Sequence, residues 1–202
     1  MKKSTLFIFI AFLIGYFTAC KQAGNSTSQG RDSLTSNSSH DSLELDSLVV
    51  KLMRWHESDN QMDFEVIKAN PGDSIYSGID WTAHKNRMAE LSKINYFTDG
   101  FLNNYNNIAL HIDKELKANP TKYHEGDMQP WSYDTNEWCN CQDYPDSSLE
   151  KLKIVDLELH GDSANFKWTW SDSLYYSVRT KKENGSWRIS YLERFDVQKF
   201  SW

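Results

Sequence analysis

The segment from Leu149 to Phe195 constrains the fold of this chain more than any other stretch. It contains four short runs in which apolar and polar residues alternate, separated by three turn-forming stretches. The last turn contains Asn184-Gly185, a dipeptide typical of two-residue β-hairpin turns. Alternation with a period of two places the apolar side chains on one face of each strand. We therefore expect a four-stranded antiparallel meander whose apolar face another part of the chain covers.

Apolar residues at helical spacing precede the meander and can supply that cover. Leu45, Leu48, Val49 and Leu52 recur at intervals that predict a first helix in a folded part starting near Ser42, with Asp46 or Ser47 as its cap. This helix would be the first of several packed against the sheet.

Two consecutive helices are expected next, over about residues 80–96 and 98–118, with Asp80 or Thr82 as the N-cap of the first and Thr98 as the N-cap of the second. Residues 70–78 are rich in Pro, Gly and Ser, so we expect a loop there. Helices followed by strands predict an α+β fold, with N-terminal helices packed on a curved antiparallel sheet that ends in the meander.

The N-terminus has the order of charged and apolar residues that marks an export signal. Lys2 and Lys3 precede the apolar run Leu6–Phe17, which is shorter than the roughly 20 residues of a membrane span. Two small residues then precede Cys20. This ending resembles the lipobox of bacterial lipoproteins. The resemblance implies a signal peptide over residues 1–19, cleavage before Cys20 and a lipid on that cysteine as the membrane contact.

The residues after Cys20 are polar, so we expect a flexible tether over residues 20–41 and a single domain over residues 42–202. Lys21-Gln22-Ala23 lacks the acidic pair associated with surface export in some bacteria. The expected location is therefore the bacterial outer membrane, with the domain facing the periplasm. A formal net charge of −6 argues against nucleic-acid binding.

Three short motifs and the order of helices before strands resemble the nuclear-transport-factor-2-like superfamily, the cystatin-like cone fold, and within it uncharacterised bacterial lipoproteins. The motifs are Tyr96-Phe97-Thr98-Asp99-Gly100-Phe101, Cys141-Gln142-Asp143-Tyr144-Pro145 and Asn184-Gly185-Ser186-Trp187-Arg188-Ile189. The resemblance implies a curved sheet around a long helix, with a pocket between them. Superfamily members include isomerases, dehydratases and binding modules. No catalytic motif of the enzymes matches residue by residue here.

Aromatic and polar residues are the candidates for lining such a pocket. Trp168, Trp170 and Trp187 share one alternation parity, so they either fill the core or stack on a flat ligand such as a sugar. His56 could transfer protons at the pocket mouth or stabilise a helix end. Asp143 could orient it or form a turn. The full candidate set is Trp55, His56, Tyr105, Asp143, Trp168, Trp170 and Trp187.

Cys139 and Cys141 suggest a metal or redox site, with His124 or His160 as a third ligand. However, Cys-x-Cys lacks the second ligand pair of a zinc site and is not the Cys-x-x-Cys of thiol oxidoreductases. The alternatives are two partly buried thiols or a local disulfide, which needs a turn between the cysteines. No metal, cofactor or catalytic residue is therefore assigned.

The opposite face of the predicted sheet is basic. The residues of outward parity are Lys167, Arg179, Lys181, Arg188 and Arg194, with Tyr175 and Leu192 among them. A basic face on an acidic protein suggests an acidic partner, a second copy of the chain or anionic headgroups as the occupant. The alternative is a solvated face with scattered salt bridges.

Two classes of function remain open. The expected one is a membrane-tethered module that binds a small molecule or a protein and catalyses no reaction. The alternative is a pocket enzyme of isomerase or hydrolase type that uses His56 and Asp143.

Overall fold

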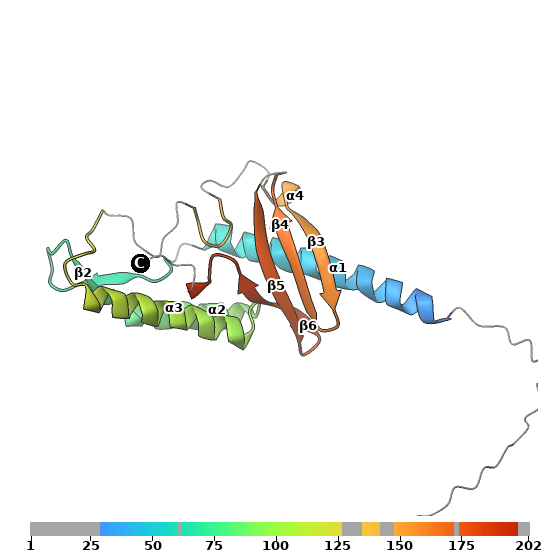
Figure 1. Cartoon of the computed structure of the whole chain (residues 1–202), viewed down its shortest axis with the longest axis horizontal. Coiled ribbons are helices and arrows are strands. Elements are labelled where there is room, and N and C mark those ends of the chain that lie inside the picture. The colour runs from blue at the N-terminus through green and yellow to red at the C-terminus, as the bar shows by residue number, and fades with distance from the viewer. Residues whose placement is uncertain (1–28, 60–61, 127–134, 142–147, 172–173, 198–202) are drawn as a thin grey trace, which may run out of the picture.

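The structure is a computed structural model, and it describes residues 29–59, 62–126, 135–141, 148–171 and 174–197 (Figure 1). Side chains are described from residue 39 onward. The elements in chain order are α1 (Gln29–Ser58), β1 (Val66–Lys68), β2 (Tyr76–Ile79), α2 (Trp81–Ile94), α3 (Asp99–Ala118), α4 (Ser148–Lys151), β3 (Lys153–His160), β4 (Ser163–Thr169), β5 (Tyr175–Glu183) and β6 (Ser186–Leu192).

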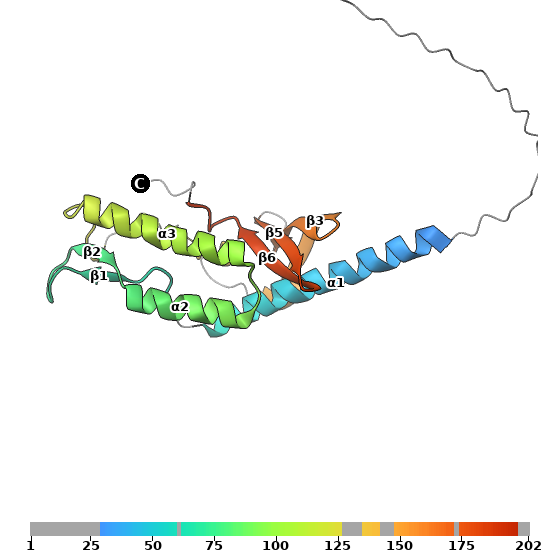
Figure 2. The same cartoon turned by 90° about the horizontal axis from the view of Figure 1, so that it is seen from below.

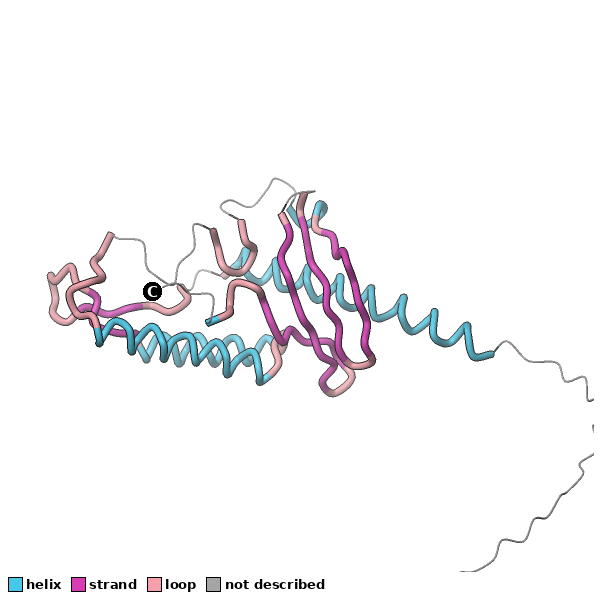
Figure 3. The backbone as a smooth tube through the Cα atoms, in the orientation of Figure 1, coloured by secondary structure: helices cyan, strands magenta, loops and turns pink. Residues whose placement is uncertain are grey.

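The predicted α+β class and the four-stranded antiparallel meander are confirmed. The strand order is β3-β4-β5-β6, so each strand pairs with its neighbour in sequence. Gly185, at φ +78°, and Asn184, at φ 53°, adopt the left-handed backbone that a tight turn between β5 and β6 requires. The strands stand side by side as one sheet in Figure 3.

A β-bulge changes the parity predicted for the end of β6. Arg179 pairs with Tyr191, but the next residue of β5, Thr180, pairs with Ile189. The extra residue on β6 places Tyr191 beside Arg179 on the outer face and buries Leu192 completely. The prediction of an outward Leu192 is therefore wrong.

Helix α1 lies across the strands of the sheet, and its apolar side is buried against them (Figures 1 and 2). Leu45, Val49, Leu52 and Met53 are almost fully buried. The helix begins at Gln29, inside the stretch predicted to be a tether, and Asp41 accepts a hydrogen bond from Trp187 at 3.0 Å. The segment from residue 29 to 41 is thus helical, and its last residue, Asp41, is bonded to the β5–β6 hairpin.

Helices α2 and α3 lie side by side, away from the strands β3 to β5, and the β1–β2 hairpin packs on them (Figure 2). Asp80, one of the two predicted candidates, caps α2, and Thr98 caps α3 as predicted. Strand β2 takes up the last three residues of the loop predicted at residues 70–78, whereas the rest of that range lies outside the helices and strands, as predicted. The Ile79 N–H of β2 donates to Oδ1 of Asp113 on α3 at 3.1 Å, a tertiary contact that the local composition does not encode.

Helix α3 contributes an apolar stripe of buried residues to the core. These residues are Phe101, Tyr105, Ile108, Ala109, Ile112 and Leu116. A backbone hydrogen bond joins the start of α3 to the sheet, because the N–H of Thr98 donates to the carbonyl of Ile189 on β6. None of the helices in the described ranges combines the length and the apolar character needed to cross a bilayer.

Candidate functional site

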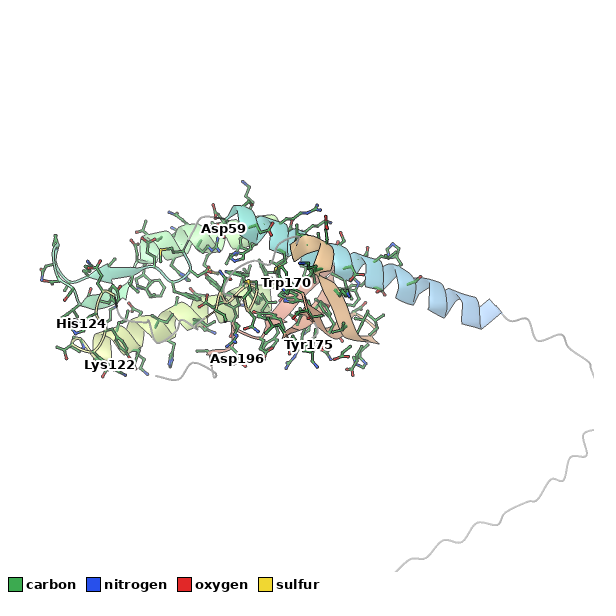
Figure 4. The ribbon with its side chains drawn as sticks, turned by 90° about the horizontal axis from the view of Figure 1, so that it is seen from above. Asp59, Lys122, His124, Trp170, Tyr175 and Asp196 are labelled. Atoms are coloured by element: carbon green, nitrogen blue, oxygen red, sulfur yellow. A yellow bond between two sulfur atoms is a disulfide. The ribbon has the colours of Figure 1, made fainter. Side chains whose placement is uncertain are left out.

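A cleft of about 440 Å³ lies at the end of the sheet where β4 finishes and β5 starts. We call it the aromatic cleft. It is lined by Thr135, Cys139, Asn140, Cys141, Trp168, Trp170, Ser171, Leu174, Tyr175 and Tyr176. Figure 4 shows Trp170 and Tyr175 close together at this end of the sheet, far from His124. The wall that faces the sheet is the segment of residues 135–141, here named the disulfide loop, and not the helices.

Trp168 and Tyr176 form the floor of the aromatic cleft. They are directly opposed on β4 and β5, and their rings stack with centroids 4.6 Å apart and planes inclined by 3°. The Tyr176 hydroxyl donates to the carbonyl of Glu137 at 2.5 Å, which fastens the disulfide loop to the sheet. Burial raises the pKa of Tyr176 well above its usual value, so this hydroxyl keeps its proton and remains a donor.

Cys139 and Cys141 are joined by a disulfide, so the local-disulfide alternative is the one the structure contains. Asn140 between them adopts a left-handed backbone with φ 53°, which provides the required turn. The metal hypothesis is wrong for this state, because neither sulfur is a free thiolate. The two histidines proposed as third ligands lie elsewhere: His124 contacts Thr121, and His160 lies beside Glu158.

Arg194 contacts the disulfide loop and not the outer face of the sheet, so its predicted outward position is wrong. Its Nε and Nη2 atoms donate to Oδ1 of Asn140 at 3.0 and 2.6 Å. Residue 194 follows the end of β6, where strand parity no longer applies. The guanidinium thereby fixes the side chain of a cleft residue.

Behind the disulfide loop lies a buried ionic network centred on Asp63. Its Oδ1 accepts from Nε of Arg87 at 2.9 Å and from the hydroxyl of Tyr105, and its Oδ2 accepts from Nε1 of Trp138 at 2.5 Å. Arg87 also forms an ion pair with Asp59 at 2.5 Å. The side chain of Arg87 is only 2% exposed, so a charge is held almost entirely away from water.

Electrostatics within the network favour a charged Arg87 and a neutral Tyr105. Burial is the largest single influence and opposes ionisation of Arg87, but Asp63, Tyr105 and Asp59 together outweigh it, so the pKa of the guanidinium lies above its usual value. Burial, together with Asp63, raises the pKa of Tyr105 well above its usual value. Arg87 also lies over the rings of Trp55 and Trp138, at 5.0 and 5.7 Å from their centroids.

Sequence reasoning missed Asp63 and Arg87. Spacing along α2 is the signal that could have found Arg87, since His84, Arg87 and Leu91 share one helix face and all three are buried. A cation on an apolar face needs a buried partner. Nothing in the sequence identifies Asp63 as that partner, because it lies in an irregular segment ahead of β1.

The seven predicted pocket residues do not come together. Trp168 and Trp170 line the aromatic cleft, whereas Trp55 and Tyr105 belong to the network. Trp187 lies at the β5–β6 hairpin and donates to Asp41. Asp143 and the lipidation candidate Cys20 lie outside the described residues.

His56 lies beside the network and does not line the aromatic cleft. Its Nε2 is 3.0 Å from Oδ1 of Asn136, and its ring centroid is 5.9 Å from that of Trp138. Burial lowers the pKa of His56, and Asp63 opposes part of that shift. His56 thus contacts the far side of the disulfide loop from the cleft floor.

The outer face of the sheet carries charges of both signs. Lys167 pairs with Asp156 at 3.0 Å, and Arg188 pairs with Glu183 at 3.4 Å. Arg179 lies over the ring of Tyr191, 4.5 Å from its centroid. Of the four cations that remain on this face, Lys167, Arg179 and Arg188 are therefore in contact with neighbouring side chains, and Lys181 is exposed.

Comparison of the chain with protein-family models, with curated proteins and with solved structures finds no match.

Proposed function

We propose that this protein is a lipid-anchored binding module of the bacterial cell envelope, which takes a small flat molecule in the aromatic cleft and catalyses no reaction. The observation that carries the proposal is the composition of the cleft. Four aromatic side chains and a disulfide line a space of about 440 Å³, and the described lining residues include no carboxylate and no imidazole. Mostly apolar concave sites of this size are typical of small-molecule binding.

The cleft is held open by contacts that do not depend on a ligand. Tyr176 bonds to Glu137, Arg194 bonds to Asn140, and the disulfide fixes the turn of the loop. A preformed site loses less conformational freedom on binding than one that must be ordered by its ligand. Rigid aromatic walls also provide stacking surfaces for a planar ring.

The titratable groups support binding over catalysis. General acid–base catalysis needs a group within hydrogen-bond reach of the substrate that gains and loses a proton near the working pH. Tyr176, in the cleft, has a raised pKa and keeps its proton. The groups of the network, Asp63, Arg87 and Tyr105, are bonded to one another behind the loop.

Anchoring through a lipid on Cys20 is part of the proposal, as is membership of the nuclear-transport-factor-2-like superfamily. The order of helices before a four-stranded meander supports the second. Helix α1 begins at Gln29, so residues 21–28 separate the lipid from the helix. A chain of that length reaches at most about 28 Å, so the domain would stay close to the membrane surface.

Thermal stabilisation of the purified chain by planar metabolites tests the proposal. We expect compounds that raise the melting temperature of the wild type to lose this effect in Trp170→Ala and to keep it in Trp81→Ala. Trp81 is the matched control, because it is 38% exposed on α2 and does not line the cleft. A turnover activity that disappears with His56→Ala or Asp143→Asn, in folded protein, would instead establish the enzyme alternative.

A further inference from the structure

We propose that the ligand of the aromatic cleft presents a hydrogen-bond acceptor, such as a carbonyl oxygen, and that the indole N–H of Trp168 donates to it. This inference rests on the proposed function, because it defines the ligand class of the same cleft. Two observations support it: the indole N–H of Trp168 is a buried donor, and the polar groups around it already hydrogen-bond to other partners.

Trp168 is fully buried, and its Nε1 has no acceptor in the part of the chain that the structure describes. Trp138 and Trp187, which are also buried, are satisfied, since Trp138 donates to Asp63 and Trp187 donates to Asp41. Leaving a buried donor without an acceptor costs about 1–3 kcal/mol, so native proteins rarely do so without a reason. An acceptor supplied by a ligand is such a reason.

The neighbouring side chains are not arranged to accept this proton. Tyr176 stacks parallel to the indole, so it covers a face of the ring, whereas the N–H lies in the ring plane. Its hydroxyl donates to Glu137. The hydroxyl of Thr169, next in sequence, exchanges hydrogen bonds with the backbone of Ser171.

Asn140 offers the cleft a second donor and not an acceptor. Its Oδ1 accepts from Arg194 twice and from Oγ1 of Thr135 at 3.3 Å. Because a guanidinium can only donate, the oxygen of this amide must face Arg194, which leaves the amide N–H₂ group for other partners. Both polar groups therefore favour a flat ring that carries an acceptor oxygen over a hydrocarbon ring of the same shape.

A pair of matched probes tests this inference on the purified chain. Coumarin is a planar bicycle with a lactone carbonyl, and 1,2-dihydronaphthalene is a bicycle of similar size with no acceptor. We expect Trp168→Phe, which keeps an aromatic ring and removes the N–H, to weaken coumarin about three- to tenfold, as the loss of one neutral hydrogen bond does. Dihydronaphthalene affinity should be unchanged within about twofold. The control Trp81→Phe should alter neither.

A second readout does not require the variant to fold. In the wild type, the indole ¹H–¹⁵N signal of Trp168, assigned through its own backbone, should move downfield with coumarin and not with dihydronaphthalene. If each probe binds the wild type and Trp168→Phe with the same affinity, and coumarin causes no downfield shift, this inference is overturned. The cleft then remains a binding site. Failure of both probes to bind, in titrations extended to their solubility limits, would count against the inference and the proposed function together.

Discussion

Nε1 of Trp138 lies 2.5 Å from Oδ2 of Asp63, although the two residues are 75 positions apart in the chain. This bond ties the disulfide loop to the segment between α1 and β1. The other oxygen of Asp63 accepts from Arg87 on α2 and Tyr105 on α3. One carboxylate therefore joins four separate parts of the chain and supports the wall of the aromatic cleft from behind.

Asp63→Asn should lower the free energy of unfolding by about 3–5 kcal/mol. The substitution leaves the charge of Arg87 buried with a weakened set of partners, and breaking a buried ion pair from one side has a cost of this size. Urea denaturation measures the loss. Asp162→Asn, in the exposed β3–β4 turn, is the matched control and should change stability by less than about 0.5 kcal/mol. Similar stability of the two variants would show that the network contributes little.

Stability should fall as the pH drops below about 6.5. Burial lowers the pKa of both His56 and His84 in the folded state, so the unfolded chain binds more protons in this range. Stability is then fully present above the unfolded pKa and decreases on acidification toward the lowered folded values. His84→Gln should flatten the profile between about pH 7.5 and 5.5, whereas the exposed His160→Gln should not. If stability depends on pH in the same way in the wild type and in both variants, burial of His84 is not a cause of the loss at low pH.

Replacing both Cys139 and Cys141 by Ser should lower stability by no more than about 2 kcal/mol, the scale of a modest single-site loss. The disulfide spans two residues in sequence, and such a small loop constrains the unfolded chain little. Ligand affinity should fall more clearly, because the loop forms a wall of the cleft. Chemical denaturation with and without dithiothreitol measures the first effect. A larger stability loss would mean that the loop is required for folding.

The outer sheet face gives a prediction about association. If two copies of the chain pair through it, Arg179→Glu combined with Arg188→Glu should abolish the dimer and change stability by less than about 1 kcal/mol, because Arg179 is exposed and Arg188 is only partly buried. Light scattering over a range of concentrations decides this. A wild-type monomer throughout the range rules out the self-association hypothesis.

The meander was predictable because its signals are local. Alternation in β3 to β6, Asn184-Gly185 in the last turn and the caps Asp80 and Thr98 all act within a few residues. The bulge in β6 was not predictable in the same way. One extra residue reverses which of Tyr191 and Leu192 faces the core, and alternation alone carries no mark of it.

The candidate site was predicted less well than the fold because its contacts are long-range. Trp168 and Trp170 were identified from parity, but the wall opposite them comes from the disulfide loop, whose position depends on Tyr176 and Arg194. The predicted start of α1, near Ser42, is too late, because the helix begins at Gln29. Its first turns contain a single apolar residue, Leu34, and Asp41 is fixed by the β5–β6 hairpin and not by its own neighbours.

A crystal structure of the protein purified from its native host shows whether the aromatic cleft binds a ligand, because a ligand acquired in the cell can remain bound. We expect density for a flat molecule in the aromatic cleft, against Trp168 and Trp170, with an acceptor atom within hydrogen-bond distance of the Trp168 indole nitrogen. A molecule bound beside His56 or Asp63 instead, with only ordered water in the cleft, would contradict this expectation.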